Sequence, residues 1–195
     1  MLKNIADDVA FLLVRKRIVD NEKREMYAYG MEVILLNVIN LVIPFIISLI
    51  MGVLIHFIIF ILVFIPLRIS TGGYHAKESG ICIIISTMLY IVSVPLSYLS
   101  SISYKNVVPL ILFVFSILAI IIFAPVENMN NPISHKSKKR NRLISLLLVS
   151  ADSIAIILFD IFSIHIASNI MIFVILASAL MIIGRFQNKT FFIFK

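Results

Sequence analysis

Residues 32–67 read EVILLNVINLVIPFIISLIMGVLIHFIIFILVFIPL. After the initial glutamate, only four polar side chains interrupt this stretch: Asn37, Asn40, Ser48 and His56. A helix rises ~1.5 Å per residue and must cross a hydrocarbon core ~30 Å thick. The length therefore predicts either two short spans that meet near Met51 and Gly52 or a re-entrant hairpin. Pro44 and Pro66 should kink or end these helices.

The rest of the chain has the same apolar character. Hydrophobic residues make up 61% of the 195 residues and charged residues 14%, with a mean hydropathy of +1.09. These values lie outside the soluble globular range. They predict an all-α integral membrane protein with about six transmembrane helices, because further apolar runs cover about 81–99, 107–124, 143–162 and 166–183. The expected organisation is an amphipathic segment 1–31, a membrane domain 32–184 and a tail 185–195.

The N-terminal segment mixes charge with apolar residues. Ile5, Val9, Leu12 and Leu13 recur at helical spacing, which predicts an amphipathic helix lying in the membrane interface. A short helix packed on the protein's own loops is the alternative. We expect no cleavable signal peptide, since no apolar core is followed by a small-residue cleavage site.

Basic residues are distributed unequally between the two sides of the predicted membrane domain. If the N-terminus is cytoplasmic, sixteen of the seventeen lysines and arginines fall on that side and only Lys105 falls outside. This bias predicts a multi-pass membrane protein with both termini and residues 68–82 on the cytoplasmic side. The net charge of +7 then faces anionic inner-leaflet lipid or an acidic polypeptide, and nucleic acid is a poor partner.

Two polar residues within the apolar runs, Asp152 and His56, are expected to need hydrogen-bond partners in the protein interior. Asp152 lies near the middle of the run 143–162, where an ionised group costs roughly 2.5–3.5 kcal/mol on insertion scales. We expect Asp152 to face the interior and to bond to Asn169 on the next helix, in a structural role. His56 is expected to be a hydrogen-bonded interior histidine.

Polar chemistry gathers in residues 68–82, RISTGGYHAKESGIC, which hold the only cysteine, one of four histidines and three of six glycines. Zinc-protease, serine-hydrolase and paired-aspartate signatures are absent from the sequence. A histidine beside a cysteine lowers the thiol pKa and can protonate a leaving amine. On an unbroken helix His75 and Cys82 would lie ~10.5 Å apart along the axis, so the segment must fold back. Ser79 is expected to cap a helix whose first turn contains Cys82.

Three features resemble the accessory gene regulator B (AgrB) family, the membrane cysteine endopeptidases of Gram-positive quorum sensing. They are Arg68, the run Gly72-Gly73-Tyr74-His75-Ala76-Lys77 with Cys82, and Ala124-Pro125-Val126-Glu127 followed by Asn130, Asn131, Pro132 and a basic cluster. The resemblance implies a catalytic pair His75 and Cys82, supported by Arg68 and Gly73. It also implies location in a bacterial cell membrane, an AgrD-like propeptide substrate, a thioester at Cys82, cyclisation to a thiolactone or lactone, and a homodimer. No cofactor or metal is expected.

The connection 125–142 is expected to lie on the same side as the motif. Its basic residues would dock the acidic tail of the propeptide: Lys136, Lys138, Lys139, Arg140 and Arg142. Two other functions are compatible with the residues alone. One is a non-catalytic transporter or assembly factor with a buried thiol, and the other is a plain hydrolytic membrane cysteine peptidase.

Overall fold

The computed structural model describes residues 2–72, 79–102, 107–126, 135–162 and 164–193. Regular structure within these ranges is helical, apart from one isolated bridge between Gly72 and Val126. The all-α prediction is therefore confirmed. In chain order the elements are α1 (Leu2–Arg15), η1 (Asn21–Lys23), α2 (Arg24–Met51), α3 (Leu54–Ile59), η2 (Phe60–Phe64), α4 (Ile65–Thr71), α5 (Ser79–Ile102), α6 (Val107–Phe123), α7 (His135–Phe162) and α8 (Ile164–Ile193).

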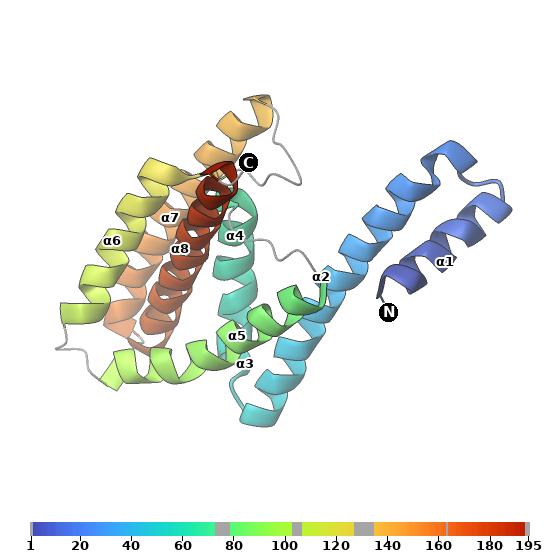
Figure 1. Cartoon of the computed structure of the whole chain (residues 1–195). Helices are drawn as coiled ribbons and strands as arrows, with labels where there is room; N and C mark the ends of the chain where they lie inside the picture. Colours follow the sequence, from blue (N-terminus) through green and yellow to red (C-terminus); the bar gives the residue numbers. More distant parts are fainter. Residues whose placement is uncertain (1, 73–78, 103–106, 127–134, 163, 194–195) are drawn as a thin grey trace.

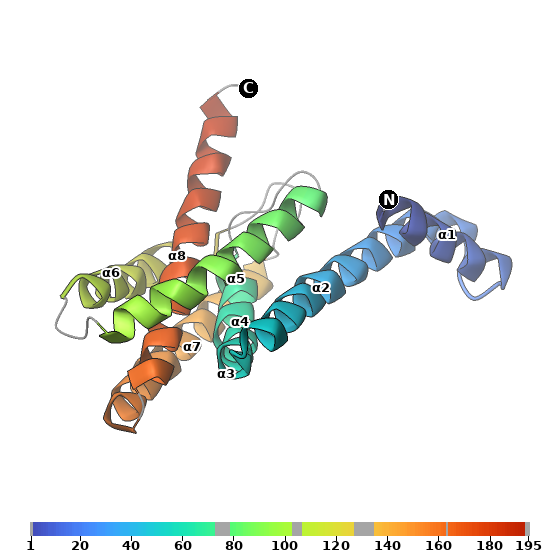
Figure 2. The ribbon, with the colours of Figure 1, turned by 90° about the horizontal axis from the view of Figure 1, so that it is seen from below.

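Helix α8 lies at the centre of the bundle (Figure 1), where it contacts α5, α6, α7 and α4. Its inward face is completely buried at Val174, Ala177 and Met181, and nearly so at Phe173. Small side chains such as Ala177 and Ser178 let neighbouring helices approach closely, which is how helices associate where lipid removes the hydrophobic driving force. Figure 2 shows the C-terminal turns of α8 extending beyond the other helices.

Within the described ranges, five helical stretches are long and apolar enough to cross a membrane: Asn21–Met51, Leu54–Thr71, Ile83–Ser101, Ser137–Ile161 and His165–Phe186. The remaining predicted span, 107–124, corresponds to α6, which is apolar apart from Ser116 but only 17 residues long. A helix of 17 residues lies at the lower limit for crossing a ~30 Å core. The protein is thus an integral membrane protein whose helices match the predicted apolar runs.

The stretch 32–67 forms a helical hairpin, with its turn where the sequence predicts it. Helix α2 begins at Arg24, eight residues before the expected start at Glu32, and its 28 residues reach ~42 Å. It ends at Gly52, whose φ of +69° is a left-handed cap. The Val53 amide then donates to the Ser48 carbonyl at 2.9 Å, and the chain returns through α3, which contacts α2, and then through η2 and α4.

Neither proline of the hairpin ends its helix, so of the two expected effects only a kink stays a prediction. Pro44 is buried inside α2, which continues to Met51. Pro66 cannot donate to the carbonyl four residues earlier. The chain accommodates it with a π-helical turn, in which the Ile65 amide donates to the Phe60 carbonyl five residues back. The helix therefore runs through Pro66 to the start of the motif.

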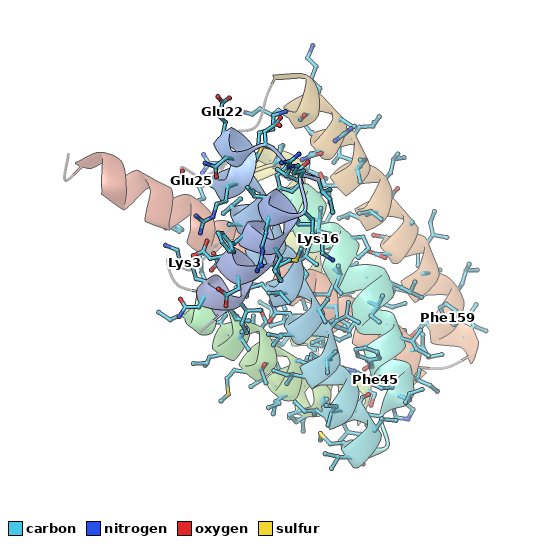
Figure 3. The ribbon with its side chains drawn as sticks, turned by 90° about the vertical axis from the view of Figure 1, so that its right-hand side faces the viewer. Lys3, Lys16, Glu22, Glu25, Phe45 and Phe159 are labelled. Atoms are coloured by element: carbon cyan, nitrogen blue, oxygen red, sulfur yellow. The ribbon has the colours of Figure 1, made fainter. Side chains whose placement is uncertain are left out.

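The N-terminal amphipathic segment is helical, as predicted, and packs antiparallel along the first half of α2. Ala6 and Ala10 are buried in this contact, while Phe11 and Leu12 remain exposed. The Arg24 guanidinium lies 5.5 Å from the centroid of the Phe11 ring. Figure 3 shows charged residues where α1 and α2 begin, including Lys3 and Glu25, and Phe45 farther along α2.

The expected bond between Asp152 and Asn169 is wrong. Asn169 instead pairs with His56 on α3, with 3.0 Å between Oδ1 and Nδ1. The other ring nitrogen of His56 lies 2.7 Å from Ser93 Oγ, so the prediction of a hydrogen-bonded interior histidine is confirmed. Asp152 is buried as expected, but its Oδ2 has no hydrogen-bond partner among the described residues.

Candidate active site

The motif begins on the last turn of α4, which is held firmly. Leu67 is completely buried, and its carbonyl accepts hydrogen bonds from Thr71 Oγ1 at 2.8 Å and Ser70 Oγ at 3.1 Å. Arg68 reaches forward along the helix and donates from Nη1 to the Gly72 carbonyl at 2.7 Å. This charge-assisted bond satisfies a carbonyl at the helix end and fixes the direction in which the chain leaves α4.

Gly72 pairs with a segment more than fifty residues away in the sequence. Its backbone forms a parallel bridge with Val126, and the Val126 amide donates to the Thr71 carbonyl at 2.9 Å. The φ of +67° and ψ of −149° at Gly72 belong to a region that essentially only glycine adopts. A Cβ at this position would overlap the Val126 carbonyl oxygen. The end of α6 thus braces the start of the motif.

The predicted catalytic pair cannot be placed at the level of its side chains. Gly73 and His75 lie outside the described residues. Cys82 belongs to α5, in its first turn as predicted, but its side chain is outside the description. Helix α5 is described from Ser79 onward, and the capping role expected of Ser79 stays a prediction. The approach of His75 to Cys82 remains a prediction.

The basic residues predicted in a connection occupy the start of a helix. Helix α7 begins at His135 rather than at Leu143, and Lys138, Lys139, Arg140 and Arg142 are exposed on its first turns. Lys136 belongs to the same helix, with its side chain outside the description. A helix N-terminus carries a partial positive charge that adds to these cations. This positive end of α7 lies at the same end of the bundle as the last turn of α4 (Figure 1).

A cavity of about 560 Å³ lies between α2, η2, α4, α5 and α8. Most of its walls are apolar, and Arg68, Gly72, Asn37, Asn40 and Ser86 supply polar groups. The sequence showed Asn37 and Asn40 only as interruptions of an apolar run. Their spacing of three residues, which puts both on one helix face, is the signal that could have identified this surface. The Val126 brace has no comparable signal because it is made by backbone atoms.

The chain matches known proteins over almost its full length. The family model for "Accessory gene regulator B" matches residues 6–184. An AgrB-like protein of Clostridium perfringens strain SM101 is 26% identical over 205 residues, which cover 97% of this chain and 96% of the relative. The accessory gene regulator protein B of Staphylococcus aureus strain RF122 is 23% identical over 145 residues, which cover 74% of this chain and 76% of the relative. No solved structure matches the chain significantly. The chain therefore belongs to the accessory gene regulator B family.

Proposed function

We propose that this protein is a membrane cysteine endopeptidase that removes the C-terminal tail of an AgrD-like propeptide and closes the remaining peptide into a thiolactone or lactone. The observation that carries the proposal is the position of Cys82 in the first turn of α5, in a family member with the motif Arg68 to Cys82. Unpaired amides and the positive end of the helix dipole at a helix start stabilise a thiolate.

The reaction needs two acyl transfers. The Cys82 thiolate attacks the carbonyl carbon before the tail, the carbon–nitrogen bond breaks, and His75 gives a proton to the departing amine. A thioester remains on Cys82. A thiol or hydroxyl inside the propeptide then gives its proton to His75 and attacks the thioester carbonyl, which releases Cys82 and closes the ring. Arg68 acts as a positioning residue through its bond to Gly72.

The relative stabilities of amides and thioesters determine the direction in which the reaction runs. Exchange between two thioesters is nearly balanced, whereas an amide is more stable than a thioester, so removal of the tail must draw the reaction forward. Water must also be kept from the acyl-enzyme. The exposed cations at the start of α7 suit the binding of an acidic tail, which would keep the leaving end away from the apolar cavity.

The test uses the full chain in lipid vesicles with a synthetic AgrD-type precursor. We expect Cys82→Ala and His75→Ala to abolish tail release while the thermal unfolding temperature stays unchanged. Mass spectrometry should find a precursor fragment bound to Cys82 in the native chain and a released peptide that is one water lighter than the linear acid. Tail release by Cys82→Ala would overturn the proposal, and a linear product would indicate plain hydrolysis.

A further inference from the structure

The wall of the cavity beside α4 includes a residue whose side-chain amide oxygen is unpaired. Asn40 Oδ1 is buried and has no hydrogen-bond partner in the described part of the chain. Asn37 lies one turn earlier on α2 and lines the same cavity. A polar group left unpaired in a low-dielectric environment costs about 1–3 kcal/mol by mutational data. The position of Asn40 therefore indicates that something with hydrogen-bonding groups occupies this cavity during function.

The shape and chemistry of the walls restrict the occupant. The cavity volume of about 560 Å³ lies within the ~300–1,000 Å³ typical of ligand pockets. Phe60, Phe64, Ile85 and Leu89 supply apolar surface. A carboxamide offers one acceptor and two donors, which match the N–H and C=O of a peptide group. Apolar walls with such amides on one side suit an extended apolar peptide and exclude an acidic one.

Helical spacing relates this cavity to the predicted nucleophile. Ile85, Ser86 and Leu89 line the cavity from α5. Position 82 lies three, four and seven residues before them on the same helix, so all four positions share one face. Gly72 and Arg68 close the cavity at the motif. A peptide in this cavity would therefore run along the face of α5 that carries position 82.

We propose that this cavity binds the apolar residues that immediately precede the scissile bond of the peptide substrate, with Asn40 hydrogen-bonded to the peptide backbone. The proposal rests on the proposed function. It gives the two sides of the scissile bond separate environments: the apolar acyl side lies among α2, α4 and α5, and the acidic leaving side lies toward the cations of α7.

The test measures binding without chemistry. All variants carry Cys82→Ala in phospholipid nanodiscs, and the probe is a fluorescein-labelled peptide with four leucines before four glutamates. Ile85→Trp fills the cavity, whereas Ile84→Trp adds the same bulk at an exposed neighbour that does not line it. We expect Ile85→Trp to raise Kd at least about tenfold and Ile84→Trp to leave it unchanged. Equal Kd values for the two variants would overturn the proposal.

Two further measurements separate folding and catalysis from binding. Asn40→Ala removes the amide without adding bulk, and it should raise the Kd for the leucine peptide severalfold. It should hardly affect a peptide with serines in place of leucines, which we expect to bind poorly to every variant. If the serine peptide binds tightly, with the same Kd for every variant, the proposal that this cavity binds the apolar residues of the substrate is contradicted. Cleavage by the chain with native Cys82 tests the proposed function independently, because Kd in the Cys82→Ala background does not depend on it.

Discussion

Gly72 combines a backbone conformation that favours glycine with a contact that leaves no room for a side chain. Any L-residue at its φ of +67° is strained by about 1–3 kcal/mol. Its added Cβ would also overlap Val126. We expect Gly72→Ala to break the bridge and to reduce precursor cleavage at least tenfold, as measured in lipid vesicles, because the start of the motif loses its brace.

Gly30 provides the matched control for this substitution. It lies inside α2, and apart from its chain neighbours and the backbone of its own helix no described atom lies within 4 Å of where a Cβ would be. Alanine there should be neutral or stabilising by up to ~1 kcal/mol, since glycine disfavours a helix interior. Full cleavage activity in Gly72→Ala, or an equal loss in Gly30→Ala, would show that the brace does not matter.

His56 connects three helices through its two ring nitrogens. His56→Ala would leave Asn169 Oδ1 without its partner in the interior, at a cost of about 1–3 kcal/mol, while Ser93 Oγ would keep its bond to the Tyr90 carbonyl. His165→Ala removes an exposed histidine and should change stability little. Thermal unfolding in detergent compares the two. In a double-mutant cycle, His56 and Asn169 should show a coupling near the ~0.6 kcal/mol average for membrane hydrogen bonds, and strict additivity would contradict the pairing.

Helix α7 has exposed cations on its first turns. Cations at a helix N-terminus are unfavourable for the helix itself, so their exposure on the first turns is better suited to binding than to stability. We expect the triple reversal Lys138→Glu, Lys139→Glu and Arg140→Glu to reduce cleavage of an acidic-tailed precursor at low salt. A precursor with a neutral tail should be affected far less, because no charge attraction is lost.

The same reversal at Lys3, Arg15 and Lys16 is the control for net charge. These residues lie on or beside α1, away from the bundle. The control should affect acidic-tailed and neutral precursors equally. If the α7 reversal also affects both equally, the basic cluster does not bind the tail.

Hydropathy located the elements better than it located their ends. Helices α2 and α7 each begin eight residues earlier than predicted. Their first turns, from Arg24 and from His135, contain polar and charged residues that lie outside the apolar run but are still helical. Hydropathy indicates which residues lie within the membrane, whereas backbone hydrogen bonding determines where a helix begins and ends. The π-helical turn before Pro66 was also missed, since a proline indicates a missing donor but not how the helix accommodates it.

At the scale of the whole molecule, the distribution of charge predicts that the motif faces the cytoplasm. The single cysteine allows a direct test. A membrane-impermeant maleimide should label Cys82 in inverted vesicles and leave it unlabelled in intact cells. In a Cys82→Ala chain, Lys105→Cys should show the opposite pattern. Labelling of Cys82 in intact cells would reverse the predicted topology.

The sequence was sufficient for the fold class and for locating the motif, but not for pairings between distant segments. The sequence favours a bond between Asp152 and Asn169 because the two residues lie in consecutive helices. In the structure, however, the rotation of α8 directs Asn169 to His56, 113 residues away. Helix rotation depends on packing along the whole bundle. The partner of Gly72 was hidden for another reason, since Val126 contributes backbone atoms that any residue would offer.

The bridge between Gly72 and Val126 also has a consequence for timing. Synthesis proceeds from the N-terminus, so residues 68–82 leave the ribosome well before residue 126. Until α6 has been inserted and its end has turned back, the start of the motif lacks its brace. If the protein is the endopeptidase proposed above, its competence for proteolysis would be acquired only late in biogenesis.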